Sequence, residues 1–198
     1  MNGFRNPVRG HPHTDVLRRV LAEREPARRS APKATPAAVL IGLFDGPLGE
    51  PRVWLVRRPQ GLRSHSGQVA LPGGKRDPGD VDLVATALRE ADEEIGLPSS
   101  AVEVLGVSDE IVTSTGYHVT PIVGWIHEPF TPRPNPSEVS RAFSAPMDAF
   151  RDRGVLRALP LEVLRRMVRS YRVEGEIVWG LTAAILGGLV QRWRPETK

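Results

Sequence analysis

The chain has 198 residues, of which 40% are hydrophobic and 25% charged, a composition typical of one globular domain. No apolar run approaches the roughly 20 residues that span a bilayer, so a membrane role is not expected. The absence of cysteine excludes disulfides, thiolate metal ligands and cysteine nucleophiles, and fits a reducing compartment such as the cytoplasm. The net charge of +4 favours anionic partners. Without a groove-reading motif, it indicates a small phosphorylated substrate rather than nucleic acid.

The amino-terminal part of the chain differs in composition from the rest. A short helix is expected up to Glu23, with Thr14 or Asp15 as its N-cap, and a polar linker rich in proline follows it. We therefore expect residues 1–36 to form an extension and residues 37–198 to form the domain.

The domain is expected to combine strands with helices. Strand-like runs occupy residues 38–44, 52–57, 101–107, 117–126, 141–146 and 176–179. Helical patterns occupy residues 82–95, 161–171 and 180–192. Asp80 or Asp82 could cap the first of these helices, and Gly96 would end it. This order predicts an α/β fold in which a mixed sheet lies between helices.

The helix expected at residues 82–95 has two distinct faces. Its apolar stripe is formed by Val84, Ala87, Leu88, Ala91 and Ile95. Glu90, Glu93 and Glu94 stand at i, i+3 and i+4 and cluster on another face, where like charges repel. A hard divalent cation such as Mg²⁺ or Mn²⁺ would remove that repulsion. The alternative for these three residues alone is an ordinary solvated acidic face.

The segment Pro72-Gly73-Gly74 lies just upstream of this helix. Glycine has no Cβ, so its backbone allows close approach of a metal or phosphate, and the Gly74 carbonyl could supply an oxygen ligand. Arg89 precedes Glu93 by four residues and could pair with it. A glycine-rich loop followed by a helix with three carboxylates favours metal-dependent chemistry over a merely solvated helix.

Residues 73–97 resemble the Nudix box, whose pattern is G-x5-E-x7-R-E-U-x-E-E-x-G-U with U aliphatic. Residues 89–97 match its second half, although Ala91 is a small choice for U. The early acidic position falls on Asp80 rather than glutamate, with one extra residue before the helix, so Asp80 is expected to touch metal less readily than the later glutamates. The resemblance implies an α/β/α sandwich with a mixed sheet, and hydrolysis of a nucleoside diphosphate-linked substrate with Mg²⁺ or Mn²⁺.

Residues upstream of the box resemble the coenzyme A diphosphatase branch of this superfamily. Arg58, Arg63, Gly67 and residues 71–74 fall on the motif of that branch. The resemblance implies cleavage of coenzyme A or acyl-CoA to 3′,5′-ADP and phosphopantetheine or its acyl form. Departures from the motif occur at Trp54, Val56, Pro59 and Leu71.

The resemblance also implies a set of metal ligands and a catalytic base. Glu90 and Glu94 are expected to bind metal directly, Glu93 directly or through water, and the carbonyl of Gly74 as a further ligand. The base would be one of these glutamates or Glu138, which resembles a late metal-binding glutamate of relatives.

Five residues are expected to contact substrate. Arg58 and Arg63 would hold phosphates, because a planar guanidinium suits bidentate contact. His65 and His118 could touch substrate, and Tyr117 could stack on a base. The alternatives are surface solubility for the arginines, structural roles for the histidines and core packing for the tyrosine.

Rival functions stay open on sequence alone. A nucleoside triphosphate, dinucleotide polyphosphate or nucleotide-sugar pyrophosphatase would use the same scaffold. A non-catalytic module that binds nucleotide or RNA would be expected to have lost a carboxylate from the helix, and none is lost here. A homodimer is one assembly left open.

Overall fold

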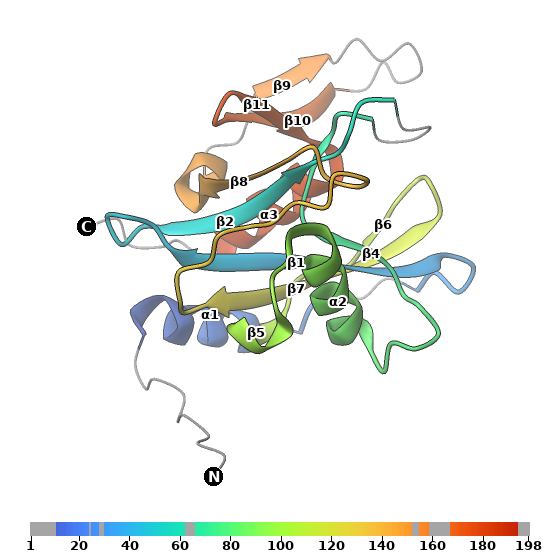
Figure 1. Cartoon of the computed structure of the whole chain (residues 1–198). Helices are drawn as coiled ribbons and strands as arrows, with labels where there is room; N and C mark the ends of the chain where they lie inside the picture. The colour runs from blue at the N-terminus through green and yellow to red at the C-terminus, as the bar shows by residue number, and fades with distance from the viewer. Residues whose placement is uncertain are drawn as a thin grey trace.

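A computed structural model describes residues 11–23, 25–27, 30–61, 66–151, 155–158 and 167–193 (Figure 1). Its helices are α1 Pro12–Ala22, α2 Leu83–Ile95 and α3 Gly180–Trp193, with short 3-10 turns η1 Ser99–Ala101 and η2 Met147–Phe150. The strands of the main sheet are β1 Thr35–Asp45, β2 Pro51–Arg57, β3 Val69–Ala70, β4 Gly73–Lys75, β5 Val102–Val107, β6 Ile111–Val112, β7 Tyr117–Ile126 and β8 Arg141–Pro146. A smaller sheet contains β9 Val155–Ala158, β10 Met167–Val173 and β11 Glu176–Trp179. None of the described helices is long and apolar enough to cross a membrane.

The main sheet is mixed and is organised around β1. This strand runs parallel to β7 along its length and antiparallel to two different neighbours on its other side. Its first half pairs with β4, where Ala38 lies opposite Gly74, and its last residues pair with β2. In the parallel ladder Ala38 lies opposite Thr120. The glycine loop is therefore a strand of the sheet, fixed in register beside α2.

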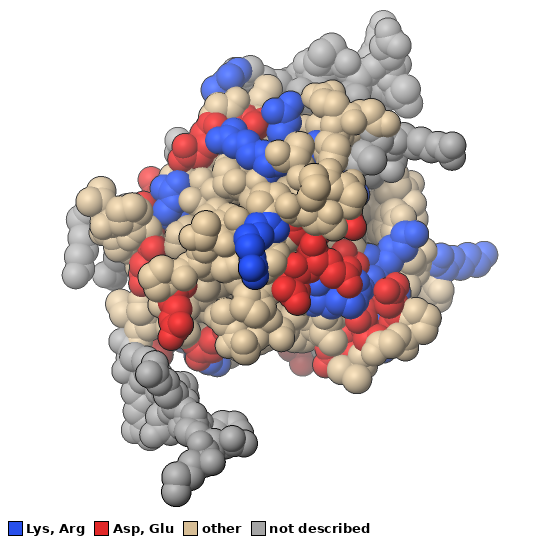
Figure 2. Space-filling model, in the orientation of Figure 1, with Lys and Arg blue, Asp and Glu red and all other residues tan. Residues whose placement is uncertain are grey.

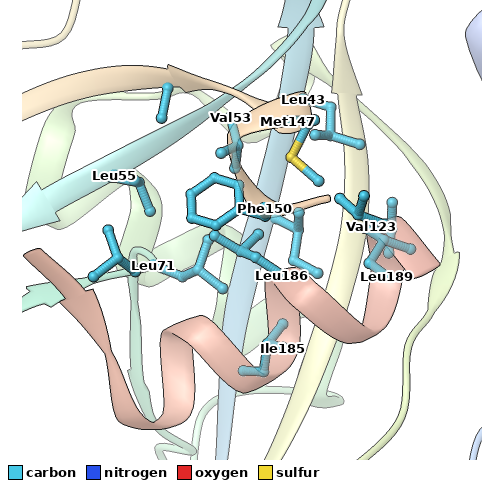
Figure 3. Close-up of a cluster of buried hydrophobic side chains, with 14 of the residues drawn as sticks. Leu43, Val53, Leu55, Leu71, Val123, Met147, Phe150, Ile185, Leu186 and Leu189 are labelled. Carbon is cyan, nitrogen blue, oxygen red and sulfur yellow. The ribbon is translucent and has the colours of Figure 1, made fainter. Parts of the chain in front are cut away.

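Helices cover both faces of this sheet (Figure 1). Alternate residues of β1 point to opposite sides, because successive side chains of a strand do so. Ala38 and Leu40 join the core under α2, whereas Ile41 and Leu43 join the core shared with α1 and α3. Figure 3 shows the second core, in which side chains of β1 and β2 meet those of α3. The predicted α/β fold, with a mixed sheet between helices, is confirmed.

Helix α2 begins and ends where its sequence predicts. Of the two candidate caps, Asp82 is the N-cap, and its Oδ1 accepts a hydrogen bond of 2.8 Å from the Ala85 amide. Gly96 ends the helix in the left-handed conformation at φ 70°, which glycine adopts without strain.

Two helix predictions are wrong in detail. The cap of α1 is His11 rather than Thr14 or Asp15, because Pro12 starts the helix and proline suits the first helical position. The helix expected at 161–171 does not form over its described part, since residues 167–171 belong to β10; residues 161–166 lie outside the described residues. Strand pairing with β9 and β11 outweighs the local helical pattern there.

Helix α1 packs into the core that α3 covers, so the amino-terminal extension contributes to the fold. Leu17 is fully buried, whereas its neighbour Val16 is 39% exposed. We expect Leu17→Ala to lower the free energy of unfolding by about 3 kcal/mol through loss of buried contacts. The matched Val16→Ala change should stay within about 0.5 kcal/mol. Urea denaturation of both variants measures this, and equal stabilities would show that α1 is not part of the cooperative unit.

Candidate active site

Three carboxylates meet beside the glycine strand. Glu90 and Glu94 project from α2, and Glu138 comes from the loop before β8. One oxygen of each lies within 4.8 Å of the others, close enough for the three carboxylates to hold one metal ion after small side-chain movements. Figure 2 shows acidic side chains gathered over α2 on this face. The expected grouping of Glu90 and Glu94 with a late glutamate is therefore present in the structure.

The carboxyl groups of this cluster are poorly solvated, which disfavours their ionised form. Glu94 is only 2% exposed, and this burial raises the pKa of its carboxyl to about 8, against the lowering effects of the Gly73 amide and Arg58. Burial likewise raises the pKa of Glu90, although Arg89 opposes that shift. The nearby Glu138 adds to both upward pKa shifts, and a bound cation would stabilise the ionised form of such carboxyls.

A side chain at either glycine of the adjoining strand would meet neighbouring atoms, but of different kinds. A Cβ on Gly73 would lie 2.3 Å from the carbonyl oxygen of Ala38, a fixed part of the sheet. A Cβ on Gly74 would lie 2.5 Å from the carboxylate of Glu90. The Gly73 amide also donates a 3.2 Å hydrogen bond to Oε2 of Glu94. The backbone thus touches two of the clustered carboxylates, and the Gly74 carbonyl stays a predicted ligand.

Arg89 connects the helix to the loop before it. Its Nε and Nη2 donate to the two oxygens of Asp80 at 3.0 and 3.1 Å, which holds the pKa of Asp80 well below its usual range. Its Nη1 lies 3.0 Å from Glu90 and 3.0 Å from Glu93. The predicted pair of Arg89 with Glu93 is confirmed. Asp80 lies outside the carboxylate group and orients the arginine instead.

Glu93 stands apart from the other acidic residues of α2. Its side chain is 52% exposed and faces Arg89, and it does not belong to the group formed by Glu90, Glu94 and Glu138. Its predicted role as a ligand, directly or through water, stays a prediction.

Of the residues expected to hold phosphates, Arg58 lies at the cluster. Its Nη1 is 4.0 Å from Oε1 of Glu94, and its buried Nε makes no hydrogen bond to the described part of the chain. A planar guanidinium beside these carboxylates suits contact with a phosphate oxygen through its terminal nitrogens. Arg63 and His65 lie outside the described residues.

The other two substrate candidates lie at the start of β7. Nε2 of His118 is 2.8 Å from Oε2 of Glu110, and the Tyr117 amide donates to Oγ1 of Thr113 at 3.0 Å. Neither side chain belongs to the carboxylate group, so their contact with substrate stays a prediction. Glu110 was not identified from the sequence. The positions of Glu110 and His118 along the chain do not indicate that the two side chains meet.

Comparison with known proteins agrees with this site. The model of the NUDIX domain matches residues 33–163, which include the carboxylate group and the glycine strand. The chain belongs to the Nudix family. It is 45% identical over 162 residues to the protein named "Uncharacterized Nudix hydrolase NudL" of Yersinia enterocolitica, covering 79% of this chain and 80% of that protein.

Two further comparisons extend this result. The NudL protein of Yersinia pestis is 42% identical over 158 residues, covering 79% of this chain and 78% of the relative. The crystal structure of the Nudix hydrolase RenU from M. smegmatis superposes with a TM-score of 0.50 at 27% identity, covering 58% of this chain and 72% of that one. The chain is a Nudix hydrolase, and its fold is that of its relatives.

Proposed function

We propose that this Nudix hydrolase cleaves the diphosphate of coenzyme A or acyl-CoA, using Mg²⁺ or Mn²⁺. The observation that supports metal-dependent hydrolysis is the group of Glu90, Glu94 and Glu138, whose oxygens lie within 4.8 Å of one another. Carboxylate oxygens are the ligands that both hard cations prefer. The acidic site and a diphosphate repel each other, and a divalent cation held by these carboxylates would remove that repulsion.

Glu90, Glu94 and Glu138 would hold the metal, with Glu93 and the Gly74 carbonyl as further oxygen donors. A bound divalent cation neutralises charge that develops on phosphate oxygens and lowers the pKa of water. The Gly73 amide fixes Oε2 of Glu94 and leaves its other oxygen directed toward Arg58. The protein thereby supplies preformed ligands at the end of a rigid helix.

The reaction requires a water molecule, a base and a held diphosphate. Water attacks one phosphorus, the bond from that phosphorus to the bridging oxygen breaks, and the second phosphate leaves with that oxygen. A carboxylate accepts the proton of the water, and our candidate is the oxygen of Glu138 that would not bind the metal. Arg58 and Arg63 hold phosphate oxygens. The products are 3′,5′-ADP and phosphopantetheine, or its acyl form.

The choice of coenzyme A rests on the upstream motif rather than on the metal site. Arg58 occupies its motif position and lies at the cluster, which supports a role in binding the diphosphate. Val56 and Pro59 replace a threonine and a serine of the motif, so two hydroxyls are absent. A substrate with a different group beyond the diphosphate is the competing candidate.

A substrate panel tests the proposal. The purified protein is assayed with coenzyme A, acetyl-CoA, oxidised dGTP, NADH and ADP-ribose, first with Mg²⁺ and then with Mn²⁺, and products are separated by chromatography. We expect kcat/KM for coenzyme A or its thioester to exceed the others by at least about tenfold. Preference for a nucleotide substrate would contradict the coenzyme A assignment. Binding without any hydrolysis would favour a non-catalytic module.

A further inference from the structure

The loop between β7 and β8 closes on the carboxyl end of α2. The last carbonyls of a helix have no partner within the helix and must find one elsewhere. The Arg133 amide donates to the carbonyl of Ile95 at 2.7 Å, and the Asn135 amide donates to the carbonyl of Glu94 at 2.9 Å. The loop that carries Glu138 is thus attached to the helix that carries the other two carboxylates.

Asn135 also organises the turn that ends at Glu138. Its side-chain Oδ1 accepts hydrogen bonds from the amide of Ser137 at 3.2 Å and the hydroxyl of Ser137 at 2.8 Å. Its carbonyl accepts from the amides of Glu138 at 3.0 Å and Val139 at 2.8 Å. One half-buried residue therefore fixes the backbone from position 135 to position 139.

The spacing of Asn135 and Glu138 is that of a capping box, in which the glutamate at the third position reaches back to the amide of the cap. Here the Asn135 amide is already bonded to the carbonyl of Glu94. The carboxylate of Glu138 consequently lies with Glu90 and Glu94 instead of closing the box.

We propose that Asn135 is a positioning residue whose side chain caps the turn before Glu138 and so places Glu138 in the metal site. The inference rests on the proposed function, because it requires Glu138 to bind metal. Asn135 is not a member of the carboxylate group, so its side chain would act on the metal through Glu138.

The test measures the affinity of the full-length protein for Mn²⁺ by electron paramagnetic resonance, without substrate. Asn135→Ala should raise the Kd for Mn²⁺ about tenfold, which is the size of effect seen when a residue that orients a metal ligand is removed. Asn135→Ser should change the Kd less than about threefold, because serine also caps turns through its side-chain oxygen. Asn135→Gly serves as the second deletion of the side chain if the alanine variant does not fold.

A double-mutant cycle with Glu138→Gln separates positioning from general destabilisation. In the Glu138→Gln background, Asn135→Ala should change the Kd less than about twofold. Asp82→Ala, which removes the cap at the other end of α2, is the matched structural control and should leave the Kd unchanged.

The possible failures are distinct. An equal effect of Asn135→Ala in both backgrounds, or no effect in the native background, would overturn the positioning role. An unchanged Kd in Glu138→Gln alone would remove Glu138 from the metal site, and with it both the ligand assignment and this inference.

Discussion

Glu94→Gln is expected to lower metal-dependent turnover by on the order of a thousandfold, the loss typical when a group that stabilises developing charge is removed. The fold should persist, because the glutamine carbonyl can still accept the hydrogen bond that the Gly73 amide gives to Glu94. Turnover of the preferred substrate at saturating Mg²⁺ measures the effect. Retained activity would exclude Glu94 as a ligand.

The same substitution should stabilise the metal-free protein at pH 8. Burial raises the pKa of Glu94 to about 8 in the folded chain, from an ordinary value of 4.5. Between these values the unfolded chain loses the proton while the folded chain keeps it, so stability falls as pH rises. Below pH 4.5 both states are protonated and this cost is absent.

Glutamine cannot ionise, so the variant should lack this decline. Melting temperatures in EDTA from pH 5 to pH 9 provide the measurement, and at pH 8 the variant should melt a few degrees higher. Glu93→Gln is the control. The side chain of Glu93 is exposed, so this variant should show the same change of melting temperature with pH as the native protein. If the melting temperatures of the native protein and of Glu94→Gln change equally with pH, Glu94 is not desolvated.

Substituting alanine for the two glycines of β4 should have different effects: Gly73→Ala should lower stability, and Gly74→Ala should weaken metal binding. Gly73→Ala places a Cβ 2.3 Å from the carbonyl oxygen of Ala38 and 2.6 Å from Cα of Val39, atoms that move only if β4 leaves β1. We expect a loss of about 3 kcal/mol in the free energy of unfolding. Chemical denaturation of the metal-free protein measures it.

Gly74→Ala should spare the fold and harm the metal site. Its Cβ would meet the carboxylate of Glu90, the movable end of a side chain, so stability should fall by less than about 1 kcal/mol. Displacement of that carboxylate should weaken Mn²⁺ binding about tenfold. If Gly74→Ala binds Mn²⁺ like the native protein, Glu90 is not held in place by this strand.

Local periodicity accounts for the part of the site that lies on α2. Residues four apart on a helix share a face, so Glu90 and Glu94 could be placed together from sequence, and both ends of the helix carry recognisable caps. Glu93 has nearly the same spacing, yet it pairs with Arg89 and lies outside the carboxylate group. Which carboxylates meet depends on where the sheet lies, and helical spacing alone does not contain that information.

Contacts between distant segments were harder to predict. Glu138 lies more than 40 residues beyond α2, and only the family resemblance suggested its place. The helix predicted over 161–171 is not formed at residues 167–171. These residues belong to β10, which is stabilised by pairing with β9 and β11. Neither the hydrogen bonds of the loop to the end of α2 nor the pair of His118 with Glu110 follows from local pattern.

The packing of α1 has a practical consequence for shortened versions of the chain. Leu17 and Leu21 belong to the buried cluster that includes Trp125 of the main sheet, and the ring of His13 stacks on Trp125. A protein that starts at residue 37 would uncover this surface, and exposed apolar patches promote aggregation. If a protein truncated at that point failed to bind nucleic acid, misfolding would explain the result as well as removal of a binding segment. Replacing exposed arginines of α1, such as Arg19, tests a nucleic-acid role while the helix stays in place.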